Sequence, residues 1–402
     1  MFGLHFSRLG SVNILAPINR ALSFISALSN SITPQRGSAA TFTRSTTATY
    51  VDDSGVIQTA AINTPRFQGG KFLSEPARTN LMIYSEDLTN AAWGAAGGLV
   101  VTPNTTISPD GSSTADTATA TSAQYLDYSA TFTNGVAYTF SIYLKSGSLT
   151  SAMLLLYGTA FNSGGANVTG DFNLAAGTVA LGNCTGGIVS VGNGWYRCWI
   201  TATLTATTGL YAWQSLRLNS AGTVYAWGAQ LEAGNRVSSY IPTVAATVTR
   251  AADSLTYPVT ASTAQGGLCF TIVPAESPST AATYPNISYL SVSNSNHIGI
   301  RTDPGNNNLL LFVYAGGSFS FDSVIASITA GSTYKVAVTW SVTDGTLAYS
   351  VNGGAVTLLT GKTLPSGLNT FKTSDVTWNG QLSDVKVFTQ TLSDNTLRQL
   401  TT

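Results

Sequence analysis

The first residues that could do chemistry in this chain of 402 residues are its carboxylates. Cleavage of a glycosidic bond needs two carboxyl groups at a fixed separation, one protonated and one ionised. The chain has only four glutamates, which are Glu75, Glu86, Glu232 and Glu276. No E-x-D-x-E run places paired acids on one face of a strand. We therefore predict that the protein is not an enzyme.

Aromatic side chains form a second group with chemical potential. The faces of sugar rings stack on Trp and Tyr, while amides and carboxylates bind the sugar hydroxyls. On an extended strand Trp195, Arg197 and Trp199 share one face, and the bulky residues between them occupy the other. The strand is therefore either buried on both sides or uses one face as a binding platform. The sequence leaves both interpretations open.

A platform of this kind would bind a glycan without cleaving it. Further aromatic residues follow within twenty positions of the strand, and polar loop residues could line the rim. We expect the glycan-binding residues among Trp195, Arg197, Trp199, Tyr211, Trp213 and Asn235.

Metal-binding and nucleophilic patterns are sparse. His5 and His297 have no partners at metal-ligand spacing. The three cysteines are odd in number and predict reduced, buried thiols, with a Cys184–Cys198 disulfide as the alternative.

Calcium is the one ion that the sequence suggests. Loop carboxylates and carbonyls bind it, and Asp110 beside Gly111, with Asp116 nearby, is the best candidate for a structural Ca²⁺ site. We expect no other cofactor.

The composition defines the elements that must position these residues. Charged residues make up only 9% of the chain, whereas hydrophobic residues make up 44%, and Ser, Thr, Gly and Asn fill the difference. Such a composition is typical of β-sheets with tight turns and argues against intrinsic disorder. The formal net charge is zero and no basic cluster occurs, so nucleic-acid binding is excluded. The sequence contains no run of eighteen apolar residues, the length that a membrane-spanning helix needs.

Alternating apolar and polar runs predict a mainly β fold with two antiparallel jelly-roll sandwiches. In the first, 86–252, we predict strands over 138–145, 151–157, 195–204, 209–218 and 224–231. In the second, 253–402, we predict strands over 268–274, 334–340, 346–352 and 380–388, and a short helix that begins near Ser393 or Asp394.

The N-terminal region differs from the rest. Apolar residues recur at three- and four-residue spacing, which predicts a short amphipathic helix within 1–32. Its stripe consists of Ile18, Leu22, Ile25, Leu28 and Ile32. We expect this helix to dock on a larger assembly or on sister copies, and the alternative is an intramolecular helix that covers a sheet.

Residues 33–85 combine arginines with acids and contain a turn at Asp52-Asp53-Ser54-Gly55. Mixed charges at this density indicate pairing inside the protein rather than a ligand surface. We interpret the segment as a collar between the N-terminus and the first sandwich.

This collar resembles a segment that is common in bacteriophage virion fibre and tail proteins. The resemblance rests on Thr43-Arg44, Ala48-Thr49-Tyr50, Asp53-Ser54-Gly55, Pro65-Arg66-Phe67 and Leu73-Ser74-Glu75-Pro76-Ala77-Arg78-Thr79-Asn80-Leu81, in this order. In those proteins the segment lies between a virion-attachment N-terminus and carbohydrate-binding-like β-modules. The blocks Tyr240-Ile241-Pro242-Thr243 and Thr249-Arg250-Ala251-Ala252-Asp253 are similar to a phrase that often follows there.

Both sandwiches carry resemblances of their own. Ser108-Pro109-Asp110-Gly111, Gly194-Trp195-Tyr196-Arg197 and Trp227-Gly228-Ala229-Gln230-Leu231-Glu232 are similar to carbohydrate-binding-module-like sandwiches. Val338-Thr339-Trp340, Asp344-Gly345-Thr346 and Trp378-Asn379-Gly380-Gln381-Leu382 are similar to concanavalin-A-like and laminin-G-like jelly rolls.

These resemblances imply a virion protein, made in the host cytoplasm. We expect a tail or virion fibre, or a spike, that attaches to other virion proteins through its N-terminus and binds a glycan of the host surface. Such fibres usually form homotrimers, in which displayed sites gain avidity. The alternatives are a capsid-decorating or head-fibre protein with a structural role, and a carbohydrate-binding protein of a bacterium or prophage.

Overall fold

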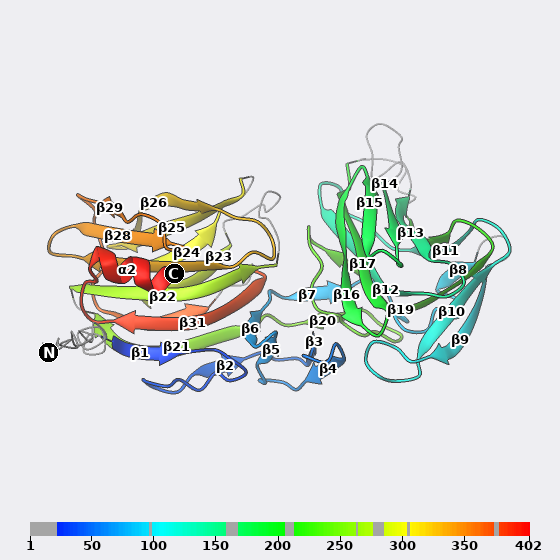
Figure 1. The fold of residues 1–402 in the computed structure, drawn as a ribbon, viewed down its shortest axis with the longest axis horizontal. Coiled ribbons are helices and arrows are strands. Elements are labelled where there is room, and N and C mark those ends of the chain that lie inside the picture. The colour runs from blue at the N-terminus through cyan, green and yellow to red at the C-terminus, as the bar shows by residue number, and fades with distance from the viewer. Residues whose placement is uncertain are drawn as a thin grey trace, which may run out of the picture.

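The structure, a computed structural model, describes residues 22–95, 99–157, 168–205, 213–262, 264–275, 285–303, 306–373 and 378–402. Within these ranges the chain forms strands β1 to β31 and helix α2. Figure 1 shows two β-sandwiches joined by strands of the collar and of the linker, residues 240–253. The prediction of a mainly β fold with two antiparallel sandwiches is confirmed. No helix in the described ranges is long and apolar enough to cross a membrane.

The first sandwich consists of two six-stranded sheets with antiparallel pairing throughout. One sheet has the order β16 (Thr185–Gly192), β17 (Trp195–Thr203), β12 (Ala137–Ser146), β19 (Gly222–Ala233), β10 (Ala115–Ala120) and β9 (Val100–Thr106). The other has the order β15 (Thr178–Gly182), β14 (Val168–Asn173), β13 (Ser151–Tyr157), β18 (Trp213–Leu218), β11 (Gln124–Ser129) and β8 (Trp93–Ala95). Alternate residues such as Phe140, Leu154 and Leu216 meet in the core between the sheets.

The second sandwich is larger. Its first sheet has the order β29 (Thr357–Leu359), β28 (Thr346–Val351), β27 (Tyr334–Ser341), β22 (Gln265–Pro274), β31 (Gly380–Phe388), β6 (Lys71–Ser74) and β5 (Arg66–Gln68), and β1 (Leu22–Ser26) also pairs with β31. Its second sheet has the order β2 (Thr41–Thr43), β21 (Ser254–Ser262), β30 (Leu368–Thr373), β23 (Asn286–Ser293), β24 (Asn296–Thr302), β25 (Asn308–Ala315) and β26 (Ser318–Ser327).

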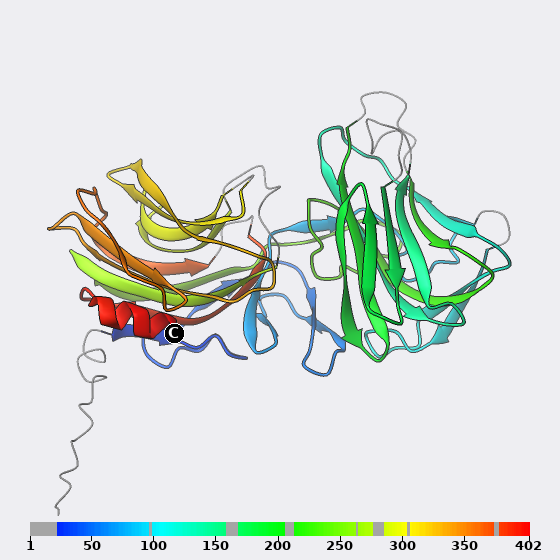
Figure 2. The same cartoon turned by 45° about the horizontal axis from the view of Figure 1, so that its top comes forward.

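Helix α2 (Asp394–Thr401) closes the second sandwich, as predicted. Ser393 is its N-cap, and the Ser393 hydroxyl accepts a hydrogen bond from the Thr396 amide. The helix, red in Figure 2, packs on β27 and β28 at the outer face of the first sheet. Leu397 of the helix is fully buried there.

The predicted N-terminal helix is wrong for the described residues of 1–32. Leu22–Ser26 forms strand β1, which pairs with the edge of β31. Its burial alternates with period two, and Phe24 is fully buried. The apolar stripe at helical spacing did not include Phe24. The segment fits both the helical period and the strand period of two, and pairing with the free edge of β31, which is remote in sequence, favours the strand.

The residues of the predicted docking stripe consequently differ in how deeply they are buried. Leu22 and Leu28 are buried in the second sandwich, whereas Ile25 and Ile32 are half-buried. Ile18 lies outside the described residues. Attachment through this region stays a prediction, but it no longer rests on a helix over 22–32.

Residues 33–85 do not form a separate collar domain. Strand β2 joins one sheet of the second sandwich, and β5 and β6 join the other. Strand β7 (Arg78–Asn80) pairs with β20 (Val248–Arg250) of the linker. Only β3 (Ala48–Val51) and β4 (Ile57–Ala60) form a hairpin of their own. The second sandwich therefore combines strands that precede the first sandwich in sequence with strands that follow it.

Buried charges hold these segments together, as the charge pattern of the collar indicated. Arg44 Nη1 lies 3.0 Å from Asp253 Oδ1, and Arg66 Nη1 lies 2.7 Å from Glu75 Oε2. Arg66 also pairs with Asp253, and Arg250 Nη2 lies 3.5 Å from Glu75 Oε2. None of the five side chains is more than 4% exposed. We call these three arginines and two acids the ionic junction.

Loss of one arginine from the ionic junction should strongly destabilise the protein. We expect Arg66→Met to lower the free energy of unfolding by about 3–5 kcal/mol, because Glu75 and Asp253 would remain buried and short of a partner. Unfolding in guanidinium chloride measures the change. Arg398→Met, at an exposed position of α2, is the control and should change it by less than about 0.5 kcal/mol. Equal effects of the two changes would contradict the role of the junction.

The ionic junction should also make stability depend on pH. Burial alone would raise the pKa of Glu75, but Arg250, Arg66 and hydrogen bonds from Ser239 hold it well below its ordinary value. The folded-state pKa therefore lies below the unfolded value of roughly 4.3, so the stabilisation is complete above that pH and is lost as the pH falls further. Denaturation midpoints measured from neutral pH to about pH 3 should fall, and less steeply for Glu75→Gln. Equal slopes for both proteins would overturn this assignment.

Candidate functional site

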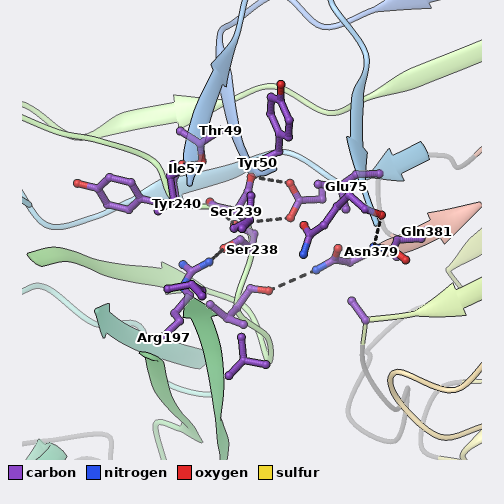
Figure 3. Close-up of a pocket in the computed structure, with 18 of the residues that line it drawn as sticks. Thr49, Tyr50, Ile57, Glu75, Arg197, Ser238, Ser239, Tyr240, Asn379 and Gln381 are labelled. Carbon is purple, nitrogen blue, oxygen red and sulfur yellow. Dashed lines mark hydrogen bonds between the residues drawn. The ribbon is translucent and has the colours of Figure 1, made fainter. Parts of the chain in front are cut away.

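A cavity of about 390 Å³ lies where the two sandwiches and the collar meet. Its volume falls in the range of ligand pockets, about 300–1,000 Å³. We call it the inter-sandwich cleft; Figure 3 shows its lining. Its aromatic side chains are Tyr50, Tyr143, Trp199 and Tyr240, and its polar ones are Gln68, Glu75, Ser190, Arg197, Ser238, Ser239, Asn379 and Gln381.

Two buried carboxylates, those of Glu75 and Glu232, hold the loop at the base of the cleft that contains Ser238 and Ser239. Glu75 accepts hydrogen bonds from the amide and hydroxyl of Ser239, at 2.7 and 2.6 Å. Glu232 accepts them from the amide and hydroxyl of Ser238, at 2.9 and 2.7 Å. Both acids therefore help to hold the loop in place, and Glu75 also takes part in the ionic junction.

The same loop contacts both walls of the cleft. Arg197 of β17 donates from Nη1 to the Ser238 carbonyl at 2.5 Å, and its guanidinium lies 5.2 Å from the ring centre of Tyr143. From the opposite side Asn379 donates from Nδ2 to the Val237 carbonyl at 3.4 Å (Figure 3). The base of the cleft is thus tied to the first sandwich and to the second.

Trp195 is a core residue and not part of a platform. It is 1% exposed, and its Nε1 donates to the Ile107 carbonyl at 3.0 Å. Ile57 and Val191 pack with it in one cluster, because the β3–β4 hairpin covers this face of β17. The turn predicted in that hairpin is present, with Gly55 at φ +82° and hydrogen-bonded to Asp52. A Cβ on Gly55 would lie 2.6 Å from the Val191 carbonyl oxygen, which shows how closely the hairpin approaches.

Trp199 and Arg197 are the predicted residues that the structure brings to the cleft. The half-buried Trp199 lies against Gly187 of β16, where a Cβ would come 2.4 Å from the indole Cζ2. Gly187 therefore allows the ring to lie flat on the neighbouring strand.

Tyr211, Trp213 and Asn235 are the other predicted glycan-binding residues. Tyr211 and the side chain of Trp213 lie outside what the structure describes, and the backbone of Trp213 begins β18 in the opposite sheet. Asn235 is half-buried, and its Oδ1 accepts a hydrogen bond from Arg236 Nε at 3.1 Å. The four of the six residues whose side chains the structure describes do not form one platform.

The sequence reasoning missed Tyr50, Gln68, Asn379 and Gln381, which come from both ends of the chain. Gln381 donates from Nε2 to the Gln68 carbonyl at 3.1 Å, and this contact links β31 to β5 past the intervening β6. Tyr50 and Asn379 lie in sequence blocks that were quoted for the family resemblances. Their place in those blocks was the only sequence signal that could have pointed to them.

The proposed calcium ligands do not form a ligand set among the described residues. Asp110 Oδ1 accepts hydrogen bonds from Ser108 and Ser112 within its own turn. Asp116 accepts them from the amides of Leu88 and Asn104, each at 3.0 Å. In the described ranges no three side chains of His, Cys, Asp or Glu converge as metal ligands. Calcium at Asp110 and Asp116 stays a prediction without further support.

The cysteines are free thiols. Cys198 lies opposite Ile188 in the β16–β17 ladder rather than opposite Cys184, so the alternative of a disulfide between them is wrong. Burial raises the pKa of Cys198 well above its ordinary value and that of Cys269 to about 11.

Comparison with known proteins finds no match to a family model and none to a curated protein. Among solved structures, the chain is similar to a native heptameric SAP-like pentraxin from Limulus polyphemus, with 20% identity over 35% of this chain and 69% of that chain and a TM-score of 0.28. It is similar to the CBM40 of Ruminococcus gnavus IT-sialidase bound to alpha2,6 sialyllactose, with 13% identity over 35% and 85% of the chains and a TM-score of 0.29.

A third similar structure is domain 4 of AbnA, a GH43 extracellular arabinanase from Geobacillus stearothermophilus, in complex with arabinotriose. The identity is 11% over 42% of this chain and 82% of that chain, with a TM-score of 0.30. The fold, from its own sheet order, is that of two antiparallel β-sandwiches, and these likenesses say nothing about what this chain binds.

Proposed function

We propose that this chain is a non-catalytic glycan-binding protein of a bacteriophage virion, in a fibre or spike, and that the inter-sandwich cleft holds the glycan. The observation that carries the proposal is the cleft itself, a cavity of about 390 Å³ with aromatic and amide side chains on its walls. Cavities of this size and lining are typical of sites for small polar ligands.

The cleft suits a neutral sugar better than a charged one. Its charged residues, Glu75 and Arg197, are already paired inside the protein. The amide groups of Asn379 and Gln381 each use one donor within the described structure, which leaves their oxygens as acceptors for hydroxyl groups. Trp199 and Tyr50 are half-buried and offer ring surface to a pyranose.

The virion part of the proposal rests on the collar. The blocks that resemble phage fibre proteins contain Arg66 and Glu75, and the following blocks contain Arg250 and Asp253. These residues form the ionic junction that positions the cleft. Attachment through the N-terminus and assembly as a homotrimer belong to the same proposal, since several weak sites displayed together gain avidity.

A direct test of adsorption uses the full-length chain. Because β1 to β7 contribute to the second sandwich and to the linker, a fragment that begins at residue 86 would lack part of the fold. We expect the chain to bind cells of a susceptible host, and periodate oxidation of surface sugars to abolish the binding. Failure to bind any host, by a protein that still incorporates into particles, would leave a structural virion role.

Filling the cleft should block glycan binding without unfolding the protein. Ser190 is exposed at the wall of the cleft, so Ser190→Tyr adds bulk there, and Trp199→Ala removes ring surface. We expect each change to weaken binding about tenfold, because an aromatic contact contributes at most about 1.5 kcal/mol and tenfold in affinity corresponds to about 1.4 kcal/mol. Ser366→Tyr, in an exposed loop, is the matched control. Calorimetric titration with a glycan from the host surface measures the effect, and full binding by both variants would exclude the cleft.

A further inference from the structure

The outer face of the second sheet in the second sandwich is aromatic where a solvent-facing sheet surface is usually polar. Ile298 and Ile300 of β24 point into the core, so His297, Gly299 and Arg301 point outward. The rings that gather around them belong to four neighbouring strands. They are Tyr289, His297, Phe312, Tyr314 and Phe319, and we call this surface the aromatic face.

Gly299 lies at the centre of the aromatic face. A Cβ there would lie 2.6 Å from Cβ of Tyr289 and 2.8 Å from Cε1 of Phe312, so glycine leaves room for both side chains over β24. His297 stacks on Tyr314 with ring centres 4.7 Å apart. The result is a continuous ring surface rather than a set of isolated aromatic residues.

This surface remains partly accessible. Phe312 and His297 are almost fully buried beneath their neighbours, whereas Phe319 is 49% exposed and Tyr289 and Tyr314 are half-buried. Helix α2 packs on β27 and β28 of the other sheet and so does not cover it (Figure 1).

One row of side chains crosses the aromatic face from a cation to an anion. The strand registers align Lys372 of β30 with Tyr289, Tyr289 with Gly299, Gly299 with Phe312, and Phe312 with Asp322 of β26. Asp322 pairs with Arg301 at 2.6 Å. Lys372 lies at the other end with Nζ 5.9 Å from the ring centre of Tyr289, and it has no ion pair among the described residues.

The charge of the aromatic face is therefore positive on the side of Lys372. Burial lowers the pKa of His297, and the nearby charges of Arg301 and Lys372 lower it further. Among the described residues of the row and of β24, Arg301 and Lys372 are the cations and Asp322 is the anion.

We propose that the aromatic face is a second binding site, for an acidic sugar such as a uronic acid residue of a polysaccharide. The ring of the sugar lies on Tyr289 and the adjoining rings, and its carboxylate accepts a hydrogen bond from the Lys372 ammonium. Ring stacking supplies contact area, and the ammonium selects the acidic sugar over a neutral one. This site lies on different elements from the inter-sandwich cleft and takes a different ligand, so it stands independently of the function proposed above.

The experiment is a calorimetric titration of the full-length chain with the trisaccharide of galacturonic acid, compared with the corresponding neutral galactose trisaccharide. We expect the acidic trisaccharide to bind and the neutral one to bind at least about tenfold more weakly. Raising the salt concentration from about 50 mM to about 500 mM should weaken the binding, because the carboxylate–ammonium contact lies at the surface.

Four variants test the placement, two at the proposed site and two as controls. Lys372→Gln and Tyr289→Leu should each weaken binding of the acidic trisaccharide by about tenfold. Lys386→Gln removes the same charge from a half-buried position on the other sheet of this sandwich and should leave binding unchanged. Ser190→Tyr, which fills the cleft, should also leave it unchanged. Absence of binding by the wild-type chain, equal binding of both trisaccharides, or full binding by Lys372→Gln in a folded protein would overturn the proposal.

Discussion

The ionic junction is the interaction on which the rest of the structure depends. Its arginines and acids come from the collar and from the linker, which are separated by the whole first sandwich in sequence. Charges so deeply buried are tolerated only when each has its partners in good geometry. Carbonyl oxygens complete the set, since Arg66 also donates to Thr49 and Arg250 donates to Pro76, each at 2.8 Å. The collar and the linker can therefore occupy only one arrangement.

The geometry of the inter-sandwich cleft follows from that arrangement. Glu75 takes part in the junction and also holds Ser239, and the neighbouring Ser238 carbonyl holds Arg197. A continuous set of hydrogen bonds thus runs from the junction to the wall of the first sandwich. A site whose walls are fixed before binding loses less conformational entropy when a ligand enters. Weak interactions with hydroxyl groups can then suffice for recognition.

Much of the fold could be predicted from local patterns. Residues 138–145 and 334–340 alternate cleanly and fall within β12 and β27, and Ser393 caps α2 as its residue type suggests. The site was predicted only in part. Arg197 and Trp199 reach the cleft, but Trp195 on the same face is covered by the β3–β4 hairpin, which lies about 140 positions earlier in the chain. Strand periodicity shows which side chains share a face and does not show what covers that face.

Composition, alternation and charge density were sufficient to predict the class of the fold and the internal pairing of the collar charges, because these properties act locally. Only the tertiary structure decided that Leu22–Ser26 is a strand, since the edge of β31 that it pairs with lies more than 350 positions away. The same holds for the cleft, which Tyr50 and Asn379 both line, and for the aromatic face, where Lys372, Tyr289 and Gly299 align. Pairing between strands distant in sequence sets these neighbours, and no local pattern encodes the choice of partner strand.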